Sequence, residues 1–114
     1  MRGDNETALA FYDPEIEMRG AIDPAKVYRG RDGVIAFFRD WLSAWDSFTA
    51  EVEEWIDTGD QVIAIVHDRA RGKLSGVDVE QRNAHLWTIR DGKLLRLRIY
   101  PSKTEALKAA GLSE

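Results

Sequence analysis

The segment from Val79 to Pro101, VEQRNAHLWTIRDGKLLRLRIYP, constrains the fold of this chain more than any other part of the sequence. It reads as two long strands rich in Leu, Ile, Trp and Tyr, joined at the turn residues Arg90-Asp91-Gly92. The hairpin indicates the fold. For function, the sequence points to a pocket more clearly than to a chemistry.

The register of this hairpin decides which side chains share a face, because a slip of one residue turns a strand over. A two-residue Asp-Gly turn sets Trp87 opposite Arg96 and separates apolar from charged residues slightly better. A three-residue loop, with Gly92 in the left-handed conformation, sets Trp87 opposite Leu95 instead. In that second register one face is mostly apolar with two polar groups, as a ligand cavity requires, and it carries Asn83, His85, Trp87, Leu95, Leu97 and Ile99.

Composition excludes several classes of function. The chain has 114 residues, enough for one domain over residues 1–114, and 44% of them are hydrophobic. A net charge of −4 argues against a nucleic-acid partner, which needs a basic face. The absence of cysteine excludes disulfides, thiol nucleophiles and thiolate metal sites. No apolar run is long enough for a membrane span or a signal peptide, so we expect a cytoplasmic protein.

The remaining elements follow from periodicity and turn residues. Apolar side chains at three- and four-residue spacing predict a helix from Gly33 to Trp45. A short helix over residues 4–12 is expected to end at Asp13-Pro14, since a residue before proline avoids the helical region. Strands are predicted over residues 15–21, 48–57 and 61–71, and a last helix over 102–110. Strands gathered after the helices indicate an α+β fold, with a curved antiparallel sheet and helices on one face.

Four segments resemble the SnoaL-like domain family of the nuclear transport factor 2-like superfamily: GRDGVIAFFRDW, DTGDQVIAIV, AHLWTIRDGKLLRLRIY and EALKAAGL. Relatives include ketosteroid isomerase, limonene epoxide hydrolase and polyketide cyclases. The resemblance covers nearly the whole chain and implies a cystatin-like cone: a bent sheet wrapped over helices and open to a pocket. It implies inward-facing side chains at Leu97 and Ile99, which favours the three-residue loop of the hairpin.

The family resemblance also implies a homodimer formed through the outer face of the sheet. We expect that contact to include Arg96 and Arg98 together with Ala84 and Leu86. Relatives carry a long first helix that ends in a turn similar to Arg2-Gly3-Asp4, so the first helix is expected to be missing or truncated here.

Three residues are candidates for catalysis. His85 lies between apolar neighbours, where burial lowers the pKa of an imidazole and leaves a neutral acid–base group near pH 7. Glu17 lies near the position where the isomerases and cyclases carry a general base, and Arg69 matches the arginine of the epoxide hydrolase strand. A purely structural histidine and a solvated Glu17 remain the alternatives.

The known mechanisms of the relatives do not transfer intact. Arg71 and Ile99 stand where limonene epoxide hydrolase carries its two acids, so that triad is not intact. The tyrosine and the late-strand acid of ketosteroid isomerase are not visible either, although Tyr12 is a candidate substitute for the first.

No metal or other cofactor is expected. His67 and Asp68 are adjacent on a strand and point to opposite faces, so they do not converge on one ion with His85. Trp41 and Trp45 share a helix face and are expected in the core or at the pocket wall. The full set of expected pocket-lining residues is Tyr12, Phe37, Trp41, Trp45, His67, Asn83, Trp87, Leu95, Leu97 and Ile99.

The sequence therefore predicts a protein that binds a small apolar organic molecule in a conical pocket. If it is an enzyme, the expected chemistry is proton transfer of the isomerase or cyclase type, with His85 and Glu17 as acid and base and Arg69 at a developing oxyanion. The alternative is a non-catalytic ligand-binding or dimerisation module with the same fold, whose pocket lacks a pair of titratable groups within hydrogen-bonding distance.

Overall fold

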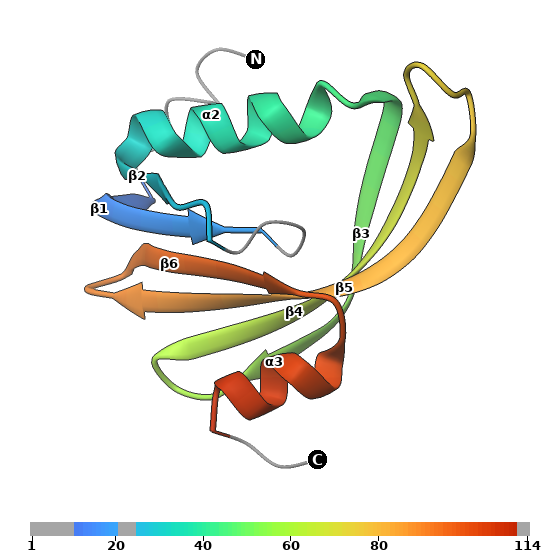
Figure 1. The fold of residues 1–114 in the computed structure, drawn as a ribbon. Coiled ribbons are helices and arrows are strands. Elements are labelled where there is room, and N and C mark those ends of the chain that lie inside the picture. Colours follow the sequence, from blue (N-terminus) through green and yellow to red (C-terminus); the bar gives the residue numbers. More distant parts are fainter. Residues whose placement is uncertain (1–10, 21–24, 112–114) are drawn as a thin grey trace.

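A computed structural model describes residues 11–20 and 25–111 of the chain, and Figure 1 shows its fold. These residues form a strongly curved sheet with one helix on each side. The elements are β1 (Tyr12–Arg19), β2 (Tyr28–Arg29), α2 (Gly30–Leu42), β3 (Trp45–Asp57), β4 (Gln61–Gly72), β5 (Asp78–Arg90), β6 (Lys93–Tyr100) and α3 (Lys103–Ala109).

The sheet has six strands in the order β2-β1-β6-β5-β4-β3. β3 to β6 form an antiparallel meander, as the sequence predicted. β1, however, pairs with β6 in parallel, so the expectation of a purely antiparallel sheet is wrong for this pair. The first strand lies beside the last one of the meander and runs in the same direction, and β2 then extends the sheet beyond it.

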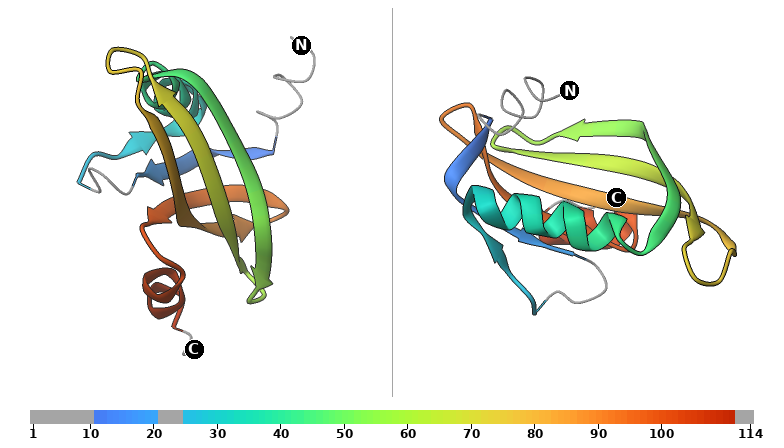
Figure 2. Two further views of the ribbon diagram at one scale, coloured as in Figure 1. Left: turned by 90° about the vertical axis from the view of Figure 1, so that its right-hand side faces the viewer. Right: turned by 90° about the horizontal axis from the view of Figure 1, so that it is seen from above.

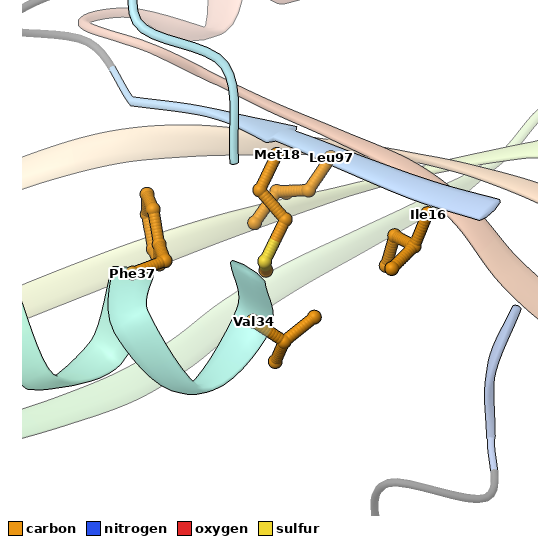
Figure 3. Packing of buried hydrophobic residues seen from close by; sticks show 5 residues of the cluster. All are labelled: Ile16, Met18, Val34, Phe37 and Leu97. Atoms are coloured by element: carbon orange, nitrogen blue, oxygen red, sulfur yellow. The ribbon is translucent and has the colours of Figure 1, made fainter. Parts of the chain in front are cut away.

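The two helices cover opposite faces of this sheet, not one face as expected (Figures 1 and 2). On the inner, concave face α2 packs against β1 and β6, and Figure 3 shows the side chains of this cluster pointing toward one another. Its buried members are Ile16, Met18, Val34, Phe37 and Leu97. On the outer face α3 packs Ala106 and Leu107 against Ile63, Ala84 and Leu86. The sheet therefore separates two apolar cores.

The N-terminal part departs from the prediction in its boundaries. β1 begins at Tyr12, so Asp13-Pro14 lies inside a strand and does not end a helix. The Asp13 carboxylate accepts a hydrogen bond from the Glu15 N–H at 2.8 Å, which stabilises the irregular backbone around the proline. Most of the expected helix over 4–12 lies outside the described part of the chain, as does the segment to which the expectation of a missing or truncated first helix refers.

The central helix begins three residues earlier than predicted. α2 spans Gly30–Leu42, and Gly30 has a φ of 72°, which favours glycine at the point where the chain leaves β2. Trp45 consequently belongs to β3 and not to the helix, so the predicted end of the helix was wrong.

The pairing of β5 with β6 matches neither predicted register, because Trp87 lies opposite Leu97 and not opposite Arg96 or Leu95. Its turn is the two-residue type, because Arg90 pairs with Lys93 and both Asp91 and Gly92 have positive φ, 52° and 75°. A bulge at Leu95 then shifts the register by one residue, so that His85 pairs with Ile99 and Trp87 with Leu97. The predicted loop was wrong, but the bulge brings Trp87, Leu97, His85 and Ile99 to one face.

No helix among the described residues is long and apolar enough to cross a membrane.

Candidate functional site

A pocket of about 540 Å³ lies between α2 and the concave face of the sheet. Its apolar wall is largely aromatic: Phe37, Phe38 and Trp41 come from α2, and Phe48 of β3 contacts the Trp41 ring at a centroid distance of 5.9 Å. Its polar lining includes Asp68, Gln81, Asn83 and His85, all from the two central strands β4 and β5. The pocket thus combines an aromatic wall with polar groups that the two central strands supply.

Strand alternation explains why these polar groups converge. Gln81, Asn83 and His85 lie two residues apart along β5, so they project from the same face of the sheet. Asp68 of β4 pairs with Gln81 in the antiparallel register and therefore projects from this face too. The face continues onto β6, where Ile99 pairs with His85 and also lines the pocket.

Three of these side chains form a hydrogen-bonded chain. The Asn83 amide donates from Nδ2 to Asp68 Oδ2 at 2.8 Å, and Asn83 Oδ1 lies 2.9 Å from His85 Nε2. Asp68 and Asn83 are buried, with exposed fractions of 5% and 9%. The Asp68 carboxylate forms no ion pair with any described residue, so this buried charge relies on the Asn83 amide and on the open side of the pocket.

The environment of His85 favours the neutral form of its ring. Burial lowers the pKa of His85 below its ordinary value, while the nearby Asp68 carboxylate acts in the opposite direction. No hydrogen bond joins Nδ1 to a described residue, and the His85 side chain lines the pocket. A ring nitrogen that is neutral, unpaired and accessible can accept a proton from a bound molecule.

A second polar cluster lies at the helix side of the pocket. The Tyr28 hydroxyl donates to Asp40 Oδ2 at 2.9 Å, and Lys26 Nζ lies 3.6 Å from the same oxygen. The hydrogen bond from Tyr28, together with Lys26, lowers the pKa of Asp40. Tyr28 and Asp40 are a directly bonded pair of titratable groups at the pocket, which the non-catalytic alternative did not predict.

Six of the ten expected pocket-lining residues lie outside this pocket. Phe37, Trp41, Asn83 and Ile99 line the pocket with His85. Tyr12, Trp87 and Leu97 instead pack in the core beneath α2, where burial raises the pKa of the Tyr12 hydroxyl. These three side chains are in the core because β1 lies against β6 at this point and fills the space beneath α2. Leu95, displaced by the bulge, and Trp45 and His67 are also outside this pocket.

His67 faces the opposite side of the sheet from His85, as expected for a residue next to Asp68. It is buried with 5% exposure, and its Nε2 lies 2.6 Å from Glu80 Oε1. Arg69 projects from the same outer face, with a largely exposed side chain 3.9 Å from Glu80. The structure therefore does not bring Arg69 or His67 near the inner pocket.

Glu17 also lies away from His85. Its side chain forms an ion pair with Arg29 of β2, while its strand neighbours Ile16 and Met18 point toward α2. Glu17 and Leu95 line a separate charged cleft of about 610 Å³, next to the bulges of β1 and β6. The acid and base expected from the sequence, His85 and Glu17, are thus on opposite faces.

Asp68, Tyr28 and Asp40 are among the pocket residues that sequence reasoning missed. The sequence analysis considered Asp68 only as a metal ligand. Because adjacent strand residues point to opposite faces, Asp68 lies on the face of Asn83 and His85, and His67 lies on the other. Tyr28 and Asp40 carry no local signal, because they meet only when β2 packs beside α2. The described residues hold no group of three or more side chains that could bind a metal ion, so none is assigned to the site.

Comparison with known families identifies the chain. Residues 1–97 match the model of the SnoaL-like domain. The chain belongs to the SnoaL-like domain family. An uncharacterised protein of Mycobacterium tuberculosis H37Rv is 33% identical over 115 aligned positions, which cover 95% of this chain and 86% of the relative.

Solved structures share the SnoaL-like fold. A nuclear transport factor 2-like protein of Burkholderia thailandensis E264 is 25% identical with a TM-score of 0.77, covering 98% of this chain and 88% of that one. A Jannaschia sp. CCS1 protein described as a SnoaL-like polyketide cyclase is 17% identical with a TM-score of 0.77, covering 98% and 81%. These matches confirm the predicted α+β, nuclear transport factor 2-like fold.

The homodimer expected for a SnoaL-like protein stays a prediction. Ala84 and Leu86, which were expected in the contact, are buried beneath α3, with exposed fractions of 0% and 6%. The uncovered part of the outer face carries paired charges, such as Arg82 with Glu53 at 2.7 Å and Arg71 with Asp78 at 3.0 Å. A partner subunit that used this face would therefore meet a polar surface.

Proposed function

We propose that this SnoaL-like protein binds a compact, mostly apolar organic molecule in the pocket beneath α2 and transfers a proton to and from it through His85. The observation that carries the proposal is the place of His85 in an aromatic pocket, with its Nε2 bonded to Asn83 and no described residue bonded to its Nδ1. Proton abstraction next to a carbonyl needs a base whose pKa is close to the working pH, and a partly buried histidine provides one.

The dimensions and chemistry of the pocket support a small organic ligand. A volume of about 540 Å³ is in the range of pockets that hold drug-sized molecules. The rings of Phe37, Phe38 and Trp41 offer flat apolar surfaces against which a ring compound can stack. The protein TerC has a similar fold, with a TM-score of 0.73 at 20% identity. TerC was co-crystallised with polyporic acid, which is an organic compound.

The reaction type we propose is isomerisation or aldol-type cyclisation. The polyketide-cyclase description of the Jannaschia relative supports this class through the fold only. In this proposal His85 acts without Glu17 or Arg69, because neither lines the pocket. His85 takes a proton from carbon on one face of the substrate and returns it to another atom of the same molecule, so no oxidant or reductant is needed.

The test is deuterium exchange into an enolisable ring ketone, with β-tetralone and indanone as probes followed by proton NMR in heavy water. We expect the protein to accelerate exchange above the buffer rate. His85→Gln should reduce the rate to the buffer level, a loss of roughly 100-fold or more if His85 is the base. Retention of the full rate in His85→Gln would remove His85 from the mechanism.

The chain provides a matched control, because it has two histidines. His67→Gln makes the same substitution on the opposite face of the sheet and should leave exchange unchanged. Binding is followed separately through the tryptophan fluorescence of the protein, to which Trp41 in the pocket wall contributes. If these ketones bind and none exchanges faster than in buffer, the non-catalytic alternative holds. Its specific support is that Glu17 and Arg69, expected as partners of His85, lie elsewhere.

A further inference from the structure

We propose that Asp68 and Asn83 are positioning residues that make His85 a proton acceptor at Nδ1, which suits the pocket to neutral carbon acids such as ring ketones and not to carboxylates. This inference rests on the proposed function for its substrate class. The positioning itself rests on the hydrogen-bonded chain from Asp68 through Asn83 to His85.

The first step concerns the orientation of the Asn83 side chain. An ionised carboxylate can only accept hydrogen bonds, so the amide group that lies 2.8 Å from Asp68 must be the NH₂ group. Both residues are buried in the sheet, which leaves the amide little freedom to rotate. Asp68 therefore determines that the Asn83 carbonyl oxygen points toward His85.

The second step concerns the protonation of the imidazole. A carbonyl oxygen only accepts, so His85 Nε2, 2.9 Å away, must carry the ring proton. In a neutral imidazole the other nitrogen then has a free lone pair. That nitrogen is Nδ1, which has no hydrogen bond to a described residue and belongs to a side chain that lines the pocket.

The third step concerns charge. When a substrate C–H bond breaks, the proton moves to Nδ1 and the electron pair stays on the substrate as an enolate. The resulting imidazolium is stabilised by the Asp68 carboxylate through the Asn83 amide, in line with the favourable effect of Asp68 on the charged form of His85. Return of the proton to a different atom completes an isomerisation and restores the neutral ring.

The other charged groups at the pocket do not replace Asp68. Asp40 is bonded to Tyr28 and Lys26, and Arg82 is bonded to Glu53 at 2.7 Å. Asp68 is the pocket carboxylate without a cationic partner among the described residues. An anionic substrate close to His85 would meet this charge, whereas a neutral ketone would not.

The first test needs no substrate. Long-range proton–nitrogen NMR of the intact protein, above the pKa of His85, reports which ring nitrogen carries the proton. We expect a single neutral form with the proton on Nε2. A proton on Nδ1 would overturn the inference, because Asn83 could not then accept from Nε2.

The second test compares two aspartates of the same pocket. Asp68→Asn removes the charge with little change in shape and should lower the pKa of His85 in an NMR titration, whereas Asp40→Asn should leave it close to that of the wild type. Asp68→Asn should also slow exchange into β-tetralone by roughly tenfold or more, as for other residues that orient a reactive histidine. An unchanged His85 pKa and an unchanged rate in Asp68→Asn would overturn the inference.

The outcomes separate this inference from the proposed function. If Asp68→Asn lowers the pKa of His85 but His85→Gln exchanges normally, the positioning role stands, while proton transfer by His85 and the inferred substrate class fail. If His85→Gln abolishes exchange but Asp68→Asn changes neither quantity, the proposed function stands and the positioning role fails.

Discussion

At the scale of single residues, the two histidines of the chain show how neighbours determine what an imidazole can do. His67 on the outer face lies between the carboxylates of Glu80 and Glu53, at 2.6 and 3.8 Å. His85 on the inner face contacts a neutral amide and aromatic walls, with a carboxylate one residue further along the hydrogen-bonded chain. The two histidines thus differ because they lie on opposite faces of the sheet: His67 contacts two carboxylates, and His85 lies in a largely aromatic pocket.

This difference predicts a dependence of stability on pH. Burial lowers the pKa of His85 in the folded protein below its ordinary value of 6.5. At a pH between the folded pKa and 6.5, the unfolded chain therefore binds more protons than the folded one. The contribution of neutral His85 is fully present above pH 6.5 and is lost as the pH falls toward the folded pKa. Each unit of pKa difference corresponds to about 1.4 kcal/mol.

Urea unfolding at several pH values between 5 and 7.5 measures this effect, since model carboxylates titrate mostly below about pH 5. We expect the free energy of unfolding of the wild type to decrease on acidification, and this slope to be smaller in His85→Gln. Equal slopes in the two proteins would contradict the lowered pKa of His85.

At the scale of elements, the hairpin of β5 and β6 is determined by its turn and its bulge together. Asp91 and Gly92 both have positive φ, a conformation that matches the twist of the flanking strands in two-residue turns. The bulge at Leu95 then decides that Leu97 and Ile99, and not their neighbours, face Trp87 and His85. Without the bulge, Arg96 would lie opposite Trp87, and its charge would be placed in the core.

Gly92→Ala is expected to destabilise the protein by about 1 kcal/mol, because an L-residue in the left-handed region has a steric cost. A Cβ at Gly92 would meet no atom within 4 Å, so the cost would be conformational and not a packing clash. The measurement is the midpoint of urea unfolding. Asp91→Asn is the control, since asparagine tolerates positive φ, and it should stay within about 0.5 kcal/mol of the wild type. An unchanged Gly92→Ala protein would mean that the turn adjusts its backbone.

At the scale of the whole molecule, the sheet is shared by two cores that serve different purposes. The cluster beneath α2 adjoins the pocket, and Phe37 belongs to both. The cluster beneath α3 lies on the outer face and contains no pocket residue. Stability of the outer core and shape of the pocket should therefore be separable by mutation.

Leu107→Ala tests this separation. It removes a side chain with 6% exposure from the outer core and should lower the free energy of unfolding by about 2–4 kcal/mol. The affinity of the folded protein for β-tetralone should stay at the wild-type level. Leu97→Ala, in the inner core with 1% exposure, should cost a similar amount and also weaken binding, because Phe37 loses its support. A pocket disturbed equally by both substitutions would show that the two cores are coupled through the sheet.

The sequence by itself determined the elements and the class of fold. Period-two and period-3.6 patterns, together with the segments that resemble the family, were sufficient for the curved α+β sheet, for the presence of the hairpin and for the inward face of Asn83, His85 and Ile99. These are local features, since each depends on residues near one another in the chain and on the alternation of a strand. The loop of the hairpin was predicted wrongly.

Only the tertiary structure decided the composition of the site. The parallel placement of β1 beside β6 filled the base of the cone and directed Glu17 toward Arg29, away from His85. Pairing of β4 with β5 brought the Asp68 carboxylate to the Asn83 amide, and packing of α2 beside β2 brought Asp40 to Tyr28. Contacts between residues so far apart in the chain depend on register and on which face of each element is covered, and neither of these is encoded in a local pattern.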